Sequence, residues 1–349
     1  MKYVFYANCI PIVGYKRVSI IDLQRDSSII IPKELYSILQ LQVCELIYTK
    51  INGLQNTDNV ELYQNLLEYM EENEIIFKTD EAESFPTLNL DYYNPSIIDN
   101  FIIDIKILEH RNFYISIFNQ LEKLGCNHIQ VRFFSKVNDN QLIDFFSLFK
   151  DFSFQGIEII LPFTKTLIPD FLINKINEFD FIFLVVVYNS PFRENYMTER
   201  YNKMGNLIYL KEDIPSEAHC GNISPNNFMQ NLKMFSESQK YNTCLNRKIS
   251  IDVNGEIKNC PSMTKSYGNI KDTTLREAIE KAGFKDVWNI NKDQIEICKD
   301  CEFRHICTDC RAYIQDPNNI YSKPAKCGYD PYTATWGEEN PTNNPLYGQ

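Results

Sequence analysis

The sequence predicts an α/β protein in three parts, and three observations lead to this prediction. Strand patterns followed by helical patterns fill residues 1–85, strands alternate with helices over residues 95–215, and eight of the eleven cysteines lie in residues 216–349. Strands that alternate with helices imply parallel pairing with right-handed crossovers. A chain of 349 residues is long enough to bury more than one core. We therefore predict domains at 1–85, 95–215 and 216–349.

The first part is predicted to contain three strands followed by three helices. Aromatic and β-branched residues mark the strands, Pro32 suits the first position of a helix, and Asp58 suits an N-cap. The predicted strands are Lys2–Tyr6, Tyr15–Ile21 and Ser28–Ile31, and the predicted helices are Pro32–Gln40, Val43–Lys50 and one that begins at Asp58. This order predicts a small winged-helix module, and Pro86 and Pro95 mark a polar linker after it.

The second part alternates regularly between strands and helices. The predicted strands are Asn100–Ile105, His128–Phe134, Gly156–Pro162, Phe181–Tyr188 and Leu207–Leu210, and the predicted helices are Asn112–Leu124, Asp139–Lys150 and Pro169–Asn177. Four or five such units are too few for a closed barrel of eight. We therefore predict a partial (β/α) barrel.

The third part is rich in turns and cysteines. Asn254-Gly255 predicts a type I′ hairpin turn between Lys248–Asp252 and Glu256–Asn259, and Asp272 or Thr273 is predicted to cap a helix that follows. Beyond Cys310 the chain is rich in turns and has few apolar residues to form a core. It therefore needs cross-links to be ordered, and metal–sulfur bonds can supply them.

Composition excludes several classes of protein. The net charge is −11, and residues 1–91 hold seven Lys and Arg against fourteen Asp and Glu, so no nucleic-acid partner is expected. No stretch approaches the roughly 20 apolar residues that span a bilayer, so no membrane partner is expected. The apolar start, Met1–Gly14, lacks the core of a signal peptide and is predicted to be a strand. We expect a cytoplasmic protein with reduced cysteines.

The cysteine spacing is compatible with three kinds of site. In Cys298-x2-Cys301-x5-Cys307, short gaps place three thiolates around an iron–sulfur cluster whose fourth ligand comes from elsewhere. Alternatively, these three and Cys310 form two C-x2-C pairs of a zinc site, although the five-residue insert is short for zinc. Disulfides or free thiols are the third interpretation. The iron–sulfur interpretation is favoured because it also employs the remaining cysteines of this part.

The full pattern resembles a known family. Cys244-x10-Gly255-x4-Cys260, followed by Cys298-x2-Cys301-x5-Cys307, Cys310 and a distant Cys327, resembles the SPASM domain of radical SAM peptide-modifying enzymes. That family usually has three residues before its sixth cysteine, whereas this chain has two, Thr308 and Asp309. The segments His219-Cys220-Gly221, Asn259-Cys260-Pro261-Ser262-Met263, Cys298-Lys-Asp-Cys301-Glu-Phe-Arg304 and Cys310-Arg-Ala-Tyr313 are similar to the grasp-with-spasm peptide maturases.

The resemblance implies cofactors, partners and ligands. It implies two [4Fe–4S] clusters, the first held by Cys220, Cys244, Cys260 and Cys310 and the second by Cys298, Cys301, Cys307 and Cys327. It implies as partners a precursor peptide and an ATP-grasp peptide ligase. The N-terminal module is similar to peptide-recognition elements, which add an extended leader segment to a sheet edge, with the third helix as the other wall.

One motif of the family is absent from this chain. Radical SAM enzymes carry C-x3-C-x2-C after the first barrel strand, and the corresponding segment, Lys106–Phe113, contains no cysteine. The remaining cysteines, Cys9, Cys44 and Cys126, are too far apart to replace it, and Cys44 and Cys126 are interpreted as buried side chains. We therefore expect a degenerate radical SAM barrel that does not cleave S-adenosylmethionine.

The leading hypothesis is an iron–sulfur accessory maturase that binds a precursor peptide and acts with the ligase. The first alternative is a redox enzyme that uses its auxiliary clusters in peptide modification. The second is a zinc-stapled peptide-binding protein. The sequence contains none of the phosphate-binding or zinc-protease motifs that would identify catalytic residues, so these stay unknown, and whether the protein is an enzyme is left open.

Overall fold

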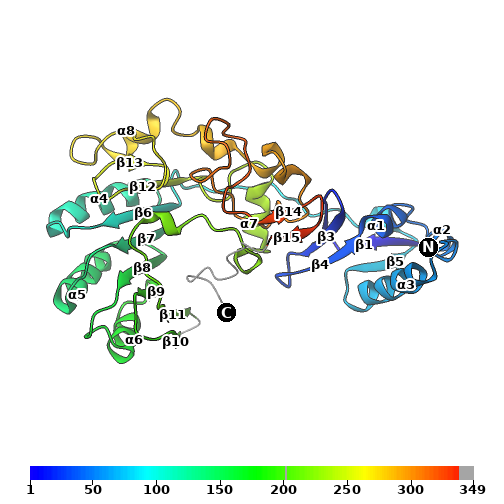
Figure 1. Ribbon diagram of the computed structural model, residues 1–349, viewed down its shortest axis with the longest axis horizontal. Coiled ribbons are helices and arrows are strands. Elements are labelled where there is room, and N and C mark those ends of the chain that lie inside the picture. The colour runs from blue at the N-terminus through cyan, green and yellow to red at the C-terminus, as the bar shows by residue number, and fades with distance from the viewer. Residues whose placement is uncertain (201–202, 338–349) are drawn as a thin grey trace.

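An eight-stranded sheet occupies the middle of the chain (Figure 1). The computed structural model describes residues 1–200 and 203–337, so the last twelve residues of the predicted third part lie outside the described residues. The sheet order is β10-β11-β9-β8-β7-β6-β12-β13. Its strands are β6 (Asn100–Ile105), β7 (His128–Phe133), β8 (Gly156–Pro162), β9 (Ile182–Tyr188), β10 (Glu194–Arg200), β11 (Lys203–Tyr209), β12 (Lys248–Ile251) and β13 (Ile257–Lys258). All neighbours pair in parallel except β10–β11 and β12–β13, so the prediction of an α/β protein with parallel strands is confirmed.

Three helices cover one face of this sheet. They are α4 (Arg111–Lys123), α5 (Asp139–Ser147) and α6 (Pro169–Glu178), and each follows a parallel strand. Because side chains alternate along a strand, Phe101, Ile103, Val131 and Ile159 point toward these helices and are buried with Phe118 and Phe146. The residues between them, including Ile102 and Arg132, therefore point to the opposite face.

The N-terminal part contains two small sheets and three helices. The elements are β1 (Lys2–Phe5), β2 (Cys9–Val13), β3 (Arg17–Asp22), β4 (Ser27–Pro32), α1 (Lys33–Leu39), α2 (Cys44–Asn52), α3 (Thr57–Glu72) and β5 (Ile76–Thr79). Strands β2, β3 and β4 form an antiparallel sheet in that order, and β1 pairs with β5. Val18, Ile31, Leu35, Ile47 and Leu67 fill the core between this sheet and the helices.

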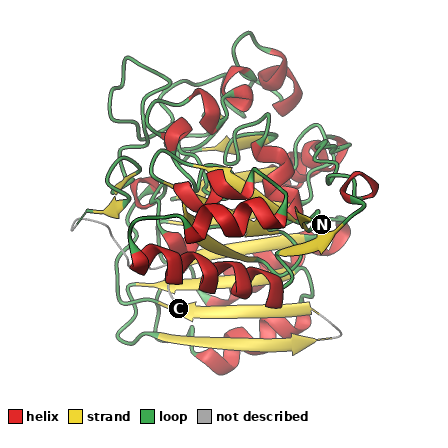
Figure 2. Ribbon diagram, turned by 90° about the vertical axis from the view of Figure 1, so that its right-hand side faces the viewer, coloured by secondary structure: helices red, strands yellow, loops and turns green. Residues whose placement is uncertain are grey.

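The C-terminal part is mostly loops and turns, as the green segments at the top of Figure 2 show. Its regular elements are α7 (Leu232–Ser238), β12, β13, α8 (Leu275–Glu280), β14 (Tyr329–Asp330) and β15 (Thr335–Trp336). Strand β12 pairs in parallel with β6, so this part is joined to the large sheet by a strand ladder.

Several sequence predictions need correction. The apolar start forms two strands, because the chain turns where Cys9 N donates to Tyr6 O (2.9 Å). Pro32 ends β4 and precedes α1 instead of opening it. Strand β10 was not predicted, because it is polar and lies at the sheet edge, where charged side chains are common.

The predicted helix N-caps and the predicted turn type also differ from those in the structure. Asn56 caps α3 by accepting from Asp58 N (2.9 Å), and Thr274 caps α8, each lying next to or near the predicted residue. The hairpin at Asn254-Gly255 exists, but only Gly255 has a positive φ (+82°). A type I′ turn needs a positive φ at both central residues, so the predicted turn type is wrong. The bonds from Gly255 N to Asp252 O (2.9 Å) and from Asp252 N to Glu256 O (3.1 Å) fit a longer loop that ends in a glycine bulge.

The N-terminal sheet packs directly against the C-terminal part. Figure 1 shows β3 and β4 beside β14 and β15. Tyr15 N donates to Asp300 O (2.7 Å), and Arg17 forms an ion pair with the fully buried carboxylate of Glu302. Apolar residues of both parts pack in one buried cluster, which contains Ile12, Ile21, Leu23, Phe303, Ile306 and Tyr329.

None of the helices in the described residues is long and apolar enough to cross a membrane.

Candidate metal centres

Four of the predicted ligand cysteines line one cavity of about 480 Å³. They are Cys220, Cys244, Cys260 and Cys310, the set predicted for the first cluster. The cavity lies on the face of the large sheet opposite to α4, α5 and α6, because its walls include Ile102, Gln130, Arg132 and Ile160. The structure therefore brings four thiols from four separate chain segments to one hollow between the sheet and the C-terminal loops.

A glycine permits the close approach of two of these segments. Gly221 follows Cys220 and has φ +85°, and a Cβ atom there would lie 2.9 Å from the Cys310 sulfur and 3.0 Å from the Tyr313 ring. A side chain at 221 would therefore push Cys310 away and strain the backbone.

We expect Gly221→Ala to lower the iron content of the protein by weakening the first cluster alone, because Cys310 and Cys220 can no longer approach each other. The measurement is iron per chain after anaerobic purification. Gly337→Ala is the matched control, since among the described residues a Cβ there would meet nothing closer than Gly328 O at 3.5 Å. Equal iron in both variants would show that this approach is unimportant.

The other four predicted ligands interact electrostatically with a buried lysine, Lys292. The side chain of Lys292 is 5% exposed. Burial lowers its pKa, but the charges of Cys307, Cys298, Asp309 and Cys327 outweigh this effect and raise the pKa overall. Burial raises the pKa of Cys301, and Lys292 opposes that rise. Cys301 and Cys327 pack against the apolar cluster that contains Cys307, and Cys298 lies on the same short segment. These four cysteines therefore form a second group, and they are the set predicted for the second cluster.

Local backbone geometry positions this second group. Ile297, which precedes Cys298, has φ +66°, a conformation that a β-branched residue rarely adopts. Strain of this kind costs about 1–3 kcal/mol and is concentrated at functional sites. Cys301 N donates to Cys298 O (3.0 Å), which closes the turn between these two thiols. A parallel bridge between Ile223 and Cys327 brings the last thiol in from the distant tail.

Burial favours the neutral form of Cys260, Cys307 and Cys310 when no metal ion is bound. Burial, followed by the charges of Cys220 and Cys244, raises the pKa of Cys260 to about 12. Burial raises the pKa of Cys307 to about 12 and that of Cys310 to about 11. Metal ions reverse this, because a thiol that coordinates a metal loses its proton. The two groups therefore suit a strongly positive centre.

The arrangement of the thiols fits a cluster that contains several metal atoms. No three His, Cys, Asp or Glu side chains in the described parts of the chain converge on a site for a single metal ion. A [4Fe–4S] cluster bonds each thiolate through a different iron, so its ligands surround a space. Four thiols around one cavity match that donor set.

A buried polar network links the two groups, and sequence reasoning did not identify it. The side chain of Asn242 accepts from Cys244 N (3.0 Å) and donates to Asp309 (2.6 Å). Asp309 also accepts from Arg311 (2.7 Å). Asp309 lies between Cys307 of one group and Cys310 of the other, so this network fixes both groups relative to each other. The sequence offers no signal for it, because contacts between distant residues leave no periodic pattern.

The remaining cysteines lie elsewhere. Cys44 and Cys126 are buried, as predicted, and so is Cys9. Cys9 and Cys44 belong to the N-terminal core, and Cys126 belongs to the core of the large sheet. None of the eleven cysteines forms a disulfide.

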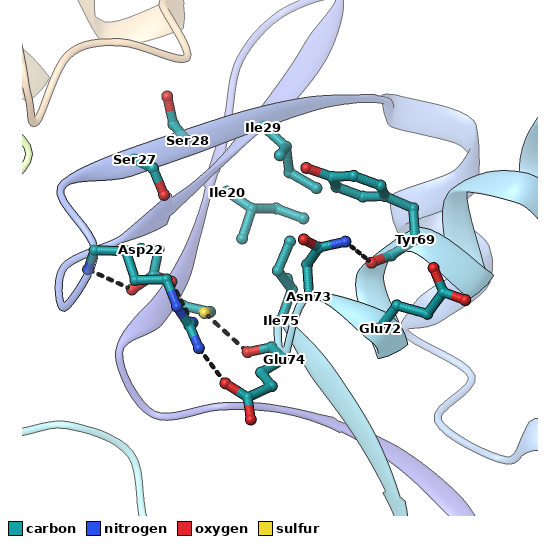
Figure 3. A pocket seen from close by; sticks show the side chains of 12 residues that line it. Ile20, Asp22, Ser27, Ser28, Ile29, Tyr69, Glu72, Asn73, Glu74 and Ile75 are labelled. Carbon is teal, nitrogen blue, oxygen red and sulfur yellow. Dashed lines mark hydrogen bonds and ion pairs between the residues drawn. The ribbon is translucent and has the colours of Figure 1, made fainter.

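The N-terminal part contains a separate groove of about 240 Å³ between β4 and α3 (Figure 3). Ser27, Ser28 and Ile29 line it from β4, and Tyr69, Glu72 and Asn73 from α3 and its end. Figure 3 shows the Tyr69 ring pointing toward Ile29. Within the described residues β4 pairs only with β3, so its outer edge is free to accept another strand.

Comparison with known families supports the metal assignment for part of the chain. Residues 243–302 match the SPASM family, an iron–sulfur cluster-binding domain. The matched segment contains Cys244 and Cys260 of the first group and Cys298 and Cys301 of the second. A SPASM match indicates that this region binds iron–sulfur clusters. No curated protein matches the chain.

Solved structures of SuiB from Streptococcus suis are distantly similar. The structure of SuiB has 11% identity and a TM-score of 0.31, and covers 88% of this chain and 96% of its own. SuiB bound to its precursor peptide SuiA has 10% identity, a TM-score of 0.36 and coverage of 89% and 96%. SuiB bound to S-adenosylmethionine has 10% identity, a TM-score of 0.31 and coverage of 88% and 96%.

Proposed function

We propose that the chain is an iron–sulfur accessory maturase for a ribosomally synthesised, post-translationally modified peptide. It binds the precursor peptide and acts with an ATP-grasp ligase in the cytoplasm, where its thiols stay reduced. The observation that carries this proposal is the cavity lined by Cys220, Cys244, Cys260 and Cys310, because two of these residues lie in the segment that matches the SPASM domain.

Each group of cysteines would hold one [4Fe–4S] cluster. Cys220, Cys244, Cys260 and Cys310 are the proposed ligands of the first, and Cys298, Cys301, Cys307 and Cys327 those of the second. A bound cluster supplies iron–thiolate bonds and the capacity to store one electron. Since the C-terminal part has few regular elements, we assign the thiolates a structural role: they join loops that apolar burial alone holds weakly.

The groove between β4 and α3 is the proposed site for the leader segment of the precursor. An extended peptide can add a strand to the free edge of β4, with main-chain hydrogen bonds for affinity and side-chain pockets for specificity. Ile29 and Tyr69 offer an apolar wall for one such side chain. The ligase partner rests on the resemblance of the cysteine motifs, and that ligase would form side-chain ester or amide cross-links in the bound peptide.

We expect Tyr69→Ala to weaken peptide binding about tenfold, as expected for loss of an aromatic anchor. The probes are synthetic peptides encoded by the short genes that flank its own, measured by fluorescence anisotropy. Leu62→Ala is the matched control, because Leu62 is on the same helix, is 45% exposed against 46% for Tyr69, and lies outside the groove. Equal affinity for both variants would place the binding site elsewhere.

Cleavage of S-adenosylmethionine is not part of the proposal. The segment between β6 and α4 starts at Lys106, ends at His110 and contains no cysteine. Incubation with S-adenosylmethionine and dithionite should therefore release no 5′-deoxyadenosine.

A redox enzyme is the second candidate, and the first cavity favours it. The cavity extends from the cysteines to the sheet residues Ile102, Gln130 and Ile160. We propose that a substrate side chain occupies this end of the cavity, beside a cluster. A reduction potential that shifts when peptide binds would support this candidate. A zinc-stapled peptide-binding protein is the third candidate, and it would be colourless and would return zinc on elemental analysis.

A further inference from the structure

One lysine side chain lies near each of the two groups of cysteines. Lys248 is the first residue of β12 and lines the cavity of the first group, where its Nζ donates to Cys244 Sγ (3.5 Å). Strand geometry explains its direction. Ile249 and Ile251 point into the core beneath α4 and α5, so Lys248 points to the opposite face, toward the cavity.

Within the described residues, no carboxylate forms an ion pair with Lys248. The two arginines that line the cavity are paired, Arg132 with Asp104 (2.6 and 2.8 Å) and Arg311 with Asp309 (2.7 Å). Burial lowers the pKa of Lys248, but the charges of Cys244 and Cys260 raise it overall. Its ammonium group lies beside the Cys244 thiol without a carboxylate partner at ion-pair distance in the described residues, although its charge also acts on the buried Glu158.

Lys292 is the lysine near the second group of cysteines. Its Nζ lies 3.9 Å from the Asp309 carboxylate, but Arg311 donates to the same carboxylate at 2.7 Å. Asp309 is thus compensated mainly by the arginine. The charges of Cys307 and Cys298, followed by those of Asp309 and Cys327, act on Lys292, so most of the groups around this lysine are cysteines.

We infer that Lys248 and Lys292 each compensate the negative charge of one cluster and raise the reduction potential of that cluster only. The inference rests on the proposed function, since it requires two clusters. A cluster with four thiolates is negatively charged, and its reduction adds one more electron, here supplied by dithionite. A cation nearby in a poorly solvated site stabilises the reduced form more than the oxidised form. Its removal should therefore lower the potential.

The test is a redox titration of the full-length protein with dithionite, followed by electron paramagnetic resonance. Lys248→Met and Lys292→Met keep the length of the side chain and remove its charge. Each is expected to shift one of two cluster signals to lower potential and leave the other in place, and the double variant shifts both. Lys248→Arg and Lys292→Arg are expected to restore the potentials.

A control separates loss of a cluster cation from loss of any partly buried lysine. Lys258 lies on β13 of the same sheet, has a side chain that is 14% exposed, and pairs with Asp252 at 2.8 Å. Lys258→Met should move neither signal. A Met variant that loses iron while its Arg counterpart retains iron also supports charge compensation.

Two results would overturn the inference. One is unchanged potentials in iron-replete Met variants, and the other is equal loss of iron in the Met and Arg variants, which would mean that shape matters and charge does not. A wild-type protein without iron is a different outcome, since it contradicts the proposed function itself.

Discussion

Replacement of Cys307 by alanine is expected to remove about half of the iron and to unfold the C-terminal part of the protein. Cys307 is buried in the apolar cluster that joins the N-terminal sheet to the C-terminal loops. Each [4Fe–4S] cluster holds four irons, so the loss of one of two clusters removes roughly half of the total. The loops around Cys298, Cys301 and Cys327 have almost no sheet or helix to hold them once the iron–thiolate bonds are gone.

The measurements are iron per chain and thermal unfolding, both under anaerobic conditions. Cys126→Ala is the matched control, because it makes the same chemical change at a buried cysteine outside both groups. That control should keep all its iron and lose little stability. Full iron content in Cys307→Ala would remove Cys307 from the proposed ligands.

Arg17→Ala is expected to destabilise the protein by about 3 kcal/mol, at the lower end of the cost of leaving a buried charge without its partner. The side chain of Glu302 is 0% exposed and that of Arg17 is 28% exposed, so in the folded protein the carboxylate depends on the arginine, not on water, to compensate its charge. Tyr329 also donates to this carboxylate, but a neutral hydroxyl group cannot replace the lost charge. The N-terminal sheet should then separate more easily from the loop that carries Cys301.

Thermal unfolding and limited proteolysis of the linker at residues 81–95 measure this effect. Lys16→Ala is the control, because Lys16 is next to Arg17, is exposed, and donates only to Thr333 O (3.3 Å). Surface substitutions of that kind change stability by less than about 0.5 kcal/mol. Arg17→Ala would contradict this account if it behaved like Lys16→Ala. The double variant of Arg17 and Glu302 should recover part of the loss, since it leaves no unpaired buried charge.

The cysteine groups were predictable from sequence because their spacing carries information. Cys298, Cys301 and Cys307 lie on one short segment, so their convergence follows from chain length alone. The long-range members, Cys220 and Cys327, were assigned through resemblance to a family. In the structure Cys220 lines the cavity with Cys244, Cys260 and Cys310, and Cys327 packs in one apolar cluster with Cys301 and Cys307, whereas the cluster that each of them binds stays a prediction. The central strands and helices were also predictable, because apolar residues repeat there with clear periods.

The missed features depend on contacts between distant residues. Lys248 looks like an ordinary surface residue in the sequence, and only the pairing of β12 with β6 directs it into the cavity. The ion pair between Arg17 and Glu302 joins positions 285 residues apart. The turn type at Asn254-Gly255 was wrong because Asp252 provides competing hydrogen bonds, accepting with its side chain from Asn254 N (2.8 Å) and Glu256 N (3.0 Å).

The most direct test of the account is the content of iron and acid-labile sulfide in protein purified without oxygen. Two [4Fe–4S] clusters predict about eight irons and about eight sulfides per chain. Protein that contains zinc or no metal, and no labile sulfide, would contradict the assignment of the eight cysteines to two clusters.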